Sequence, residues 1–185
     1  MKHTLIVAAL SAVMVAGCTN TPTNNGRTDP TYEDAAKVQF LVANRAAAGQ
    51  LVDGLDRDAY GNAPILVATV VNINDLRRSA PLGRSLSEQY SSELVARGYN
   101  VKELKLRGDV FVQEGTGELL LSREIKDIAR SHSAILVLVG TYSMASNFTY
   151  INLKLVRTED GRIIRASDYA LPNDRDVTRL LQTSR

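Results

Sequence analysis

The segment Ile65–Ile73 reads ILVATVVNI and is almost continuously apolar and rich in β-branched residues. A run of this kind between turn-forming residues predicts a central strand that is covered on both faces. Pro81 then suits the first turn of a helix, in which large side chains recur every fourth residue from Leu82 to Leu94. Such a buried strand and helix limit the chain to folds in which a parallel sheet packs against helices.

Gly98 is placed to end this helix in a left-handed conformation, with Tyr99 folding back against Leu94. The following segment, Val101–Leu106, alternates between apolar and charged residues and therefore predicts a half-exposed strand. Strand, helix and strand together predict one right-handed β-α-β unit.

Further elements are expected on both sides of this unit. Apolar residues at helical spacing predict a helix over residues 33–55. The other expected elements are a short strand over 109–113, a turn over 114–118, a helix from Ser122 to about His132, and strands over 135–143, 148–157 and 162–171. The last three form an antiparallel meander, in which Ile151, Leu153 and Leu155 share one face. We therefore expect a single α/β (mixed α+β) domain with a mixed sheet and helices packed on it.

The N-terminus has the features of a bacterial export signal. Lys2 precedes an apolar run from Leu5 to Val15, which is too short to cross a bilayer as a helix. The run ends in Val-Ala-Gly-Cys at the only cysteine, Cys18, and this ending resembles the lipobox of bacterial lipoproteins. The resemblance implies removal of residues 1–17 and acylation of Cys18. Several acyl chains would anchor the mature chain stably, and Thr19 after the cysteine favours the outer membrane.

The remaining chain divides by composition. Residues 18–32 comprise the lipidated cysteine and a Thr-, Asn- and Pro-rich tether with no core-forming pattern. Residues 33–172 form the domain, and residues 173–185 form a polar C-terminal tail that is either a short helix or frayed. The 185-residue chain has a net charge of +2, which falls when Lys2 is removed. The cluster of Arg77, Arg78 and Arg84 is interrupted by acidic residues, so no nucleic-acid partner is expected.

The sequence contains no assembled catalytic motif, and we expect neither an enzyme nor a cofactor or metal site. His132, the candidate catalytic histidine, is better explained as a cation at a helix C-terminus. Asp56–Gly61 resembles the start of a calcium loop but lacks its twelfth-position glutamate, so we interpret it as a connecting loop. Gly115–Gly117 is interpreted as a turn. Tyr142 and Tyr150 flank one hairpin and form either a docking surface or cross-strand packing.

The ordered domain resembles the FlgO family from about Leu51 to Pro172. The matching segments, in the family's order, are Pro64–Leu76, Ser79–Arg84, Ser87–Gln89, Glu93–Leu94, Arg97–Tyr99, Leu120–Glu124, Val139–Tyr142 and the closing strand pair. The resemblance implies a non-catalytic outer-membrane lipoprotein that supports flagellar stability and motility, in some bacteria within an outer-membrane ring.

Two functions follow from these observations. The first is a structural or assembly component of the flagellar outer-membrane apparatus, anchored through Cys18 on the periplasmic face, with protein partners and a possible homo-oligomer. The alternative is a periplasmic envelope lipoprotein that binds a small ligand or the cell wall. A ring component needs an extended contact surface, whereas a ligand-binding module needs a pocket with converging polar groups.

Overall fold

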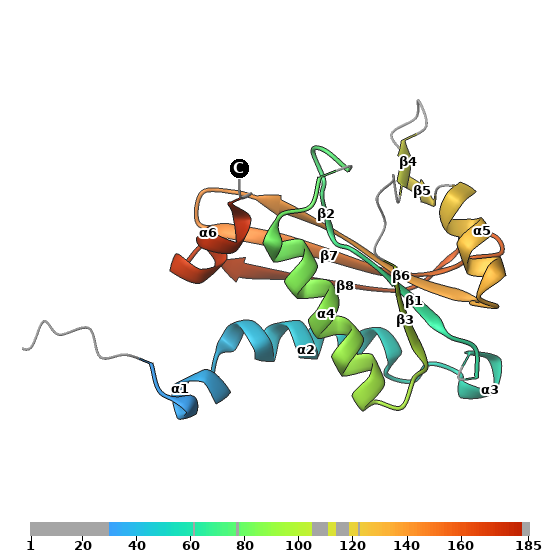
Figure 1. The fold of residues 1–185 in the computed structure, drawn as a ribbon, viewed down its shortest axis with the longest axis horizontal. Coiled ribbons are helices and arrows are strands. Elements are labelled where there is room, and N and C mark those ends of the chain that lie inside the picture. Colours follow the sequence, from blue (N-terminus) through green and yellow to red (C-terminus); the bar gives the residue numbers. More distant parts are fainter. Residues whose placement is uncertain are drawn as a thin grey trace, which may run out of the picture.

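The computed structural model describes residues 30–60, 62–76, 78–104, 111–113, 119–121 and 123–182 (Figure 1). The signal segment, Cys18, most of the tether, Arg77, Gly61, the turn 114–118 and Ser122 lie outside the described residues. The elements in chain order are α1 Tyr32–Ala36, α2 Gln39–Val52, α3 Arg57–Tyr60, β1 Ile65–Ala68, β2 Val71–Asn72, α4 Pro81–Ala96, β3 Val101–Leu104, β4 Phe111–Gln113, β5 Leu119–Leu121, α5 Arg123–Ser131, β6 Leu136–Met144, β7 Phe148–Arg157, β8 Ile163–Pro172 and α6 Arg175–Leu181.

The main sheet is mixed, as the sequence predicts. Its six strands run in the order β3-β1-β6-β7-β8, with β2 paired to β6 beyond the end of β1. Strands β3, β1 and β6 are parallel, which confirms the β-α-β unit, and β6, β7 and β8 form the expected antiparallel meander. Strands β4 and β5 make a separate two-stranded hairpin, of which β5 was not expected.

Helices lie on both faces of the sheet (Figure 1), and a hydrophobic core is buried on each face. Helices α2, α4 and α6 cover one face, on which Leu51, Leu86 and Val177 join Leu153 and other residues in one buried cluster. Helix α5 covers part of the opposite face, where Ile125 and Ala129 pack with residues of β1 and β6. The side chains of β7 alternate accordingly: Ile151, Leu153 and Leu155 are buried, while Asn152 and Lys154 are partly exposed.

The expected continuous strand over Ile65–Ile73 is wrong, because the chain leaves the sheet at Thr69–Val70 between β1 and β2. The Val70 N–H donates to Ser87 Oγ of α4 at 3.0 Å, and the Val70 carbonyl accepts from Ser79 Oγ at 2.8 Å. Helix α4 also approaches closely here, since a Cβ on Gly83 would lie 2.0 Å from the Val70 carbonyl oxygen. Ser79, just before α4, and Ser87, within it, thus make the hydrogen bonds to Val70 that a neighbouring strand would otherwise make.

The expected helix over residues 33–55 is also wrong in its continuity. Helix α1 ends at Ala36, Val38 is extended at ψ 115°, and α2 stops at Val52. Helix α1 has a Thr31–Asp34 capping box, but Tyr32 is 98% exposed and no residue of α1 with a described side chain is buried. A short helix gains most of its stability from packing, and in this region the buried core residues lie in α2 rather than α1.

The expected end of α4 is confirmed. Gly98 has a φ of +83°, and the N–H groups of Gly98 and Tyr99 donate to the carbonyls of Val95 and Leu94. These two bonds form a Schellman motif. Tyr99 and Leu94 are both buried in the same core cluster.

Candidate functional site

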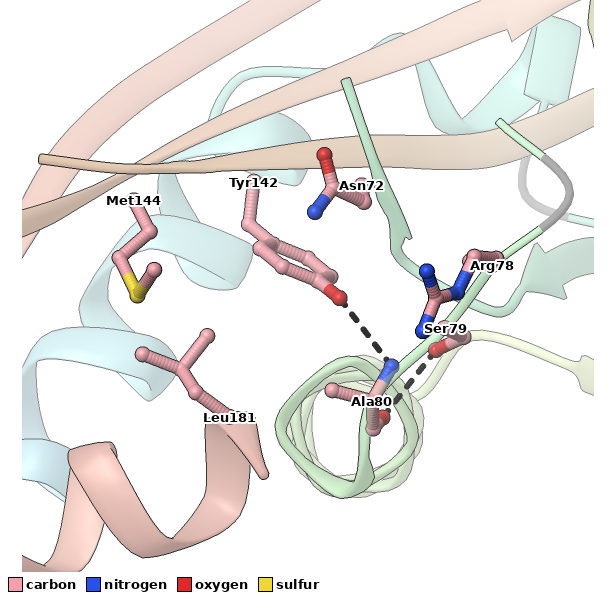
Figure 2. A pocket seen from close by; sticks show the side chains of 7 residues that line it. All are labelled: Asn72, Arg78, Ser79, Ala80, Tyr142, Met144 and Leu181. Atoms are coloured by element: carbon pink, nitrogen blue, oxygen red, sulfur yellow. Dashed lines mark hydrogen bonds between the residues drawn. The ribbon is translucent and has the colours of Figure 1, made fainter. Parts of the chain in front are cut away.

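A cavity of about 370 Å³ opens at the N-terminal end of α4. We call it the α4 cavity; Figure 2 shows its lining residues, which come from β2, β6, the turn before α4, and α6. They are Asn72, Arg78, Ser79, Ala80, Tyr142, Met144 and Leu181. Its volume falls in the range of small-molecule sites, and polar side chains form one wall and apolar side chains the other.

The sheet and helix α4 fix the position of Tyr142 in this cavity. Asn72 and Tyr142 are register partners in the parallel pair of β2 and β6. Helix α4 begins at Pro81 after Ala80, which has no side chain that can cap the helix. The Ala80 N–H donates to the Tyr142 hydroxyl at 3.1 Å, as the dashed line between these two residues in Figure 2 shows. Tyr142 is only 4% exposed and therefore joins the helix start to the sheet.

The remaining polar groups of the α4 cavity differ in how they are bonded. The Ser79 hydroxyl donates to two backbone carbonyls, those of Val70 and Ala80, and Figure 2 shows the second bond. Asn72 accepts a hydrogen bond from the Asn74 N–H at its Oδ1, at 2.8 Å. Arg78 is exposed, and among the described residues no acceptor engages its guanidinium group. The cavity therefore offers hydrogen-bond donors, which suits binding of an acceptor.

A second polar cluster lies in the core between α2, α4 and β8. Asn44 Nδ2 donates to Gln89 Oε1 at 2.6 Å, and the Tyr169 hydroxyl donates to Asn44 Oδ1 at 2.6 Å. Since Tyr169 has only one hydroxyl proton, Tyr90 must donate the bond of 2.5 Å between the two hydroxyls. Burial raises the pKa of both tyrosines, most strongly for Tyr90. Every member of this cluster has a partner, so its role is to fix the three elements together.

A second cavity, of about 290 Å³, lies beside the loop that was compared with a calcium site. Asp56 Oδ1 accepts from the N–H groups of Asp58 and Ala59 at 3.0 and 3.2 Å, so it caps α3. Across the cavity Arg157 bonds to Asp160 at 2.9 Å, and this hydrogen bond lowers the pKa of the Asp160 carboxyl. Among the described residues, no group of three His, Cys, Asp or Glu side chains could hold a metal ion.

The other sequence candidates do not come together. His132 is exposed just after α5, and its Nδ1 lies 3.4 Å from the Lys102 ammonium. Tyr142 and Tyr150 lie on opposite faces of the sheet, because Tyr142 pairs with Ile151 whereas Tyr150 pairs with Ser143. The interpretation of the two tyrosines as one docking surface is therefore wrong. Cys18 and Gly115–Gly117 lie outside the described residues.

Sequence reasoning missed Arg78 and Asn72 as site residues, and it placed Arg78 in a solvated cluster. The sequence showed only that Ala80, which precedes Pro81, has no side chain that could cap the helix. It could not show that the Tyr142 hydroxyl accepts the Ala80 N–H, because the two residues are far apart in the sequence.

Within the described residues, no helix has both the length and the apolar character needed to cross a bilayer. A comparison with curated proteins found no match. Among solved structures, the chain is similar to the LpoB C-terminal domain from Escherichia coli, with 18% identity and a TM-score of 0.49 over 71% of this chain and 97% of that chain. It is similar to the same domain from Salmonella enterica, with 14% identity and a TM-score of 0.49 over 69% of this chain and 93% of that chain. It is also similar to the PelC dodecamer from Paraburkholderia phytofirmans, with 14% identity and a TM-score of 0.42 over 62% of this chain and 74% of that chain.

The family comparison covers most of the domain. The model described as FlgO protein matches residues 45–176. This range begins within α2, includes every strand of the main sheet and ends in the first turn of α6. It therefore contains the polar wall of the α4 cavity. It also contains α4 and β8, which carry Tyr90 and Tyr169 of the second polar cluster. The match agrees with the resemblance in the sequence. The chain is a member of the FlgO family.

Proposed function

We propose that this protein is a non-catalytic outer-membrane lipoprotein that serves as a structural or assembly component of the flagellar apparatus. The observation that carries the proposal is the FlgO family match over residues 45–176. Family membership supports a cell-envelope lipoprotein, and the Val-Ala-Gly-Cys ending at Cys18 supports the anchor. In this proposal the domain faces the periplasm and binds protein partners of the flagellar outer-membrane machinery.

The lipid anchor gives this proposal a physical mechanism. Acyl chains on Cys18 would confine the domain to the membrane plane and raise its effective concentration there. The residues from Thr19 to Thr31 would reach at most about 45 Å when extended. Weak contacts between neighbouring domains or partners could then accumulate into a closed ring without a large interface.

The sheet face opposite α2 and α4 supports a role in protein contacts. Helix α5 packs on the β1 and β6 side of this face, whereas Phe148 and Tyr150 of β7 are 45% and 49% exposed. The paired positions of β8, Pro172 and Ala170, are exposed beside them. A protein partner can use such flat, partly aromatic strand surface.

A deletion strain tests the proposal directly. We expect reduced swimming or fragile flagella, restored by the wild-type gene and restored poorly by Cys18→Ser expressed at the same level. The control is Arg45→Gln, a substitution on the exposed side of α2 that leaves Cys18 intact. Normal swimming, with flagella of normal number and strength in the deletion strain, would exclude the flagellar role.

The alternative is an envelope lipoprotein that binds a small ligand or the cell wall. One observation favours it, namely that the α4 cavity brings polar side chains together beside an apolar wall. This alternative predicts normal motility in the deletion strain and a ligand-dependent change at the start of α4. The two functions are therefore separated by the same strain and by a binding experiment on the purified protein.

A further inference from the structure

We propose that the α4 cavity binds a carboxylate carried by a compact apolar group, through Arg78, Asn72 and Tyr142. The inference concerns the chemistry of the cavity and does not depend on a flagellar role. It rests on an account of which polar atoms around the cavity already have partners.

Asn72 contributes a donor. Its side-chain oxygen accepts the Asn74 N–H at 2.8 Å, which fixes the orientation of the amide group. In Figure 2 the oxygen points away from Tyr142, while the amide nitrogen lies on the side of the Tyr142 ring. No acceptor among the described residues engages this nitrogen. The side chain can therefore donate into the cavity but cannot accept without breaking its own turn.

Tyr142 contributes a second donor. Its hydroxyl oxygen accepts the Ala80 N–H at 3.1 Å, and no acceptor for its own proton is found in the described part of the chain. The residue is 4% exposed, so this proton has little access to bulk water. A buried hydroxyl of this kind gains most from an acceptor that enters the cavity.

Arg78 contributes the charge. Its guanidinium group lines the cavity, and Figure 2 shows it near Asn72 and Ser79. Ser79 has no proton left for an incoming group, because its hydroxyl already donates to the backbone carbonyls of Val70 at 2.8 Å and Ala80 at 3.2 Å. The side-chain groups left available for hydrogen bonding are thus mainly donors, and one of them is cationic. Such a set recognises an anion.

The shape of the site selects among anions. The planar guanidinium fork matches a planar carboxylate, whose two oxygens can also accept from Tyr142 and Asn72. Met144 and Leu181 form the apolar wall, and Met144 is 64% exposed. A ligand that joins a carboxylate to a small apolar group would bond to one wall and cover the other. Both the C-terminal residue of a peptide and a short fatty acid have this chemistry.

Binding can be measured by calorimetry on the full chain purified in detergent. The probes are N-acetyl-leucine, hexanoate, N-acetyl-leucinamide and inorganic phosphate. We expect both carboxylates to bind, and the uncharged amide to bind at least about tenfold more weakly. Tighter binding of N-acetyl-leucine identifies a peptide terminus as the source, and tighter binding of hexanoate identifies a fatty acid. Equal binding of the amide, tighter binding of phosphate, or no binding at about 10 mM carboxylate would overturn the proposal.

Variants locate the site. Arg78→Gln should weaken N-acetyl-leucine binding at least about tenfold, and Arg78→Lys should restore only part of it because the fork is lost. Arg45→Gln removes an exposed arginine from α2 and is the matched control, which should bind as the wild type does. Tyr142→Phe tests the hydroxyl, with thermal unfolding to confirm that the fold is retained. Unchanged affinity in both Arg78 variants would place the ligand elsewhere and refute the inference.

Discussion

Two serines of α4, one helical turn apart, are buried in different circumstances. Ser87 accepts the Val70 N–H and donates to the Gly83 carbonyl at 2.8 Å, whereas the buried Ser91 hydroxyl has no hydrogen-bond partner among the described residues. We expect Ser87→Ala to lower the free energy of unfolding by about 1–3 kcal/mol, because it leaves a buried N–H unsatisfied. Ser91→Ala should be neutral or stabilising by up to about 1 kcal/mol. Urea unfolding measures both, and equal losses would contradict the assignment.

Gly98 isolates the contribution of backbone conformation at the end of α4. A Cβ there would lie 3.7 Å from Arg57 Nη1, an ordinary contact, so a substitution meets no steric obstacle. The φ of +83° is nevertheless unfavourable for a β-branched residue. Gly98→Val should therefore destabilise the protein by about 1–2 kcal/mol, and Gly98→Asn by less. Similar unfolding midpoints for the valine and asparagine variants would argue against the left-handed cap.

At the scale of elements, the second polar cluster, with Tyr90 and Tyr169, links α2 and α4 to β8 by hydrogen bonds. It also makes the free energy of unfolding depend on pH. Burial raises the pKa of Tyr90 and Tyr169 above the ordinary value of 10.0. The folded protein therefore holds these protons more tightly than the unfolded chain does. Their contribution to stability is complete below pH 10 and is lost as the pH rises above it.

Between pH 9 and pH 11 the wild type should therefore lose on the order of 1 kcal/mol of unfolding free energy for each of the two tyrosines. A Tyr90→Phe/Tyr169→Phe variant should lack this loss, although it is less stable at neutral pH. Denaturant titrations at several pH values compare the two proteins. Parallel pH profiles would show that the two hydroxyls ionise alike in the folded and unfolded states.

The elements also show what the sequence could and could not predict. Strand β7 was predicted with its observed bounds, Phe148–Arg157, because its alternation reflects the two faces of one sheet. The break at Thr69–Val70 was not predicted, because it depends on hydrogen bonds from Ser79 and Ser87, which only the folded chain brings there. The register that separates Tyr142 from Tyr150 likewise depends on the hairpin geometry rather than on composition.

At the scale of the whole molecule, we expect the mature chain to begin at an acylated Cys18. Mass spectrometry of the N-terminal peptide should show the mass of lipid on Cys18 and no residue from the segment 1–17. Membrane fractionation should find wild type in the outer membrane and Cys18→Ser displaced from it. An intact Met1, or an unmodified Cys18 thiol on the mature protein, would contradict the proposed anchor.

The mixed sheet also has a consequence for the order in which the protein folds. Strands β6, β7 and β8 pair with their neighbours in sequence, whereas Ile65 of β1 must find Leu136 of β6 across the intervening helices. Closing the shorter loops loses less chain entropy, so we expect the meander to form first and the parallel half to join it. Substitutions in the core of β7 should then slow folding, whereas those in β1 should mainly speed unfolding. The C-terminal half would thus be the template onto which the N-terminal half pairs, and this pairing can begin only after the whole domain has been synthesised.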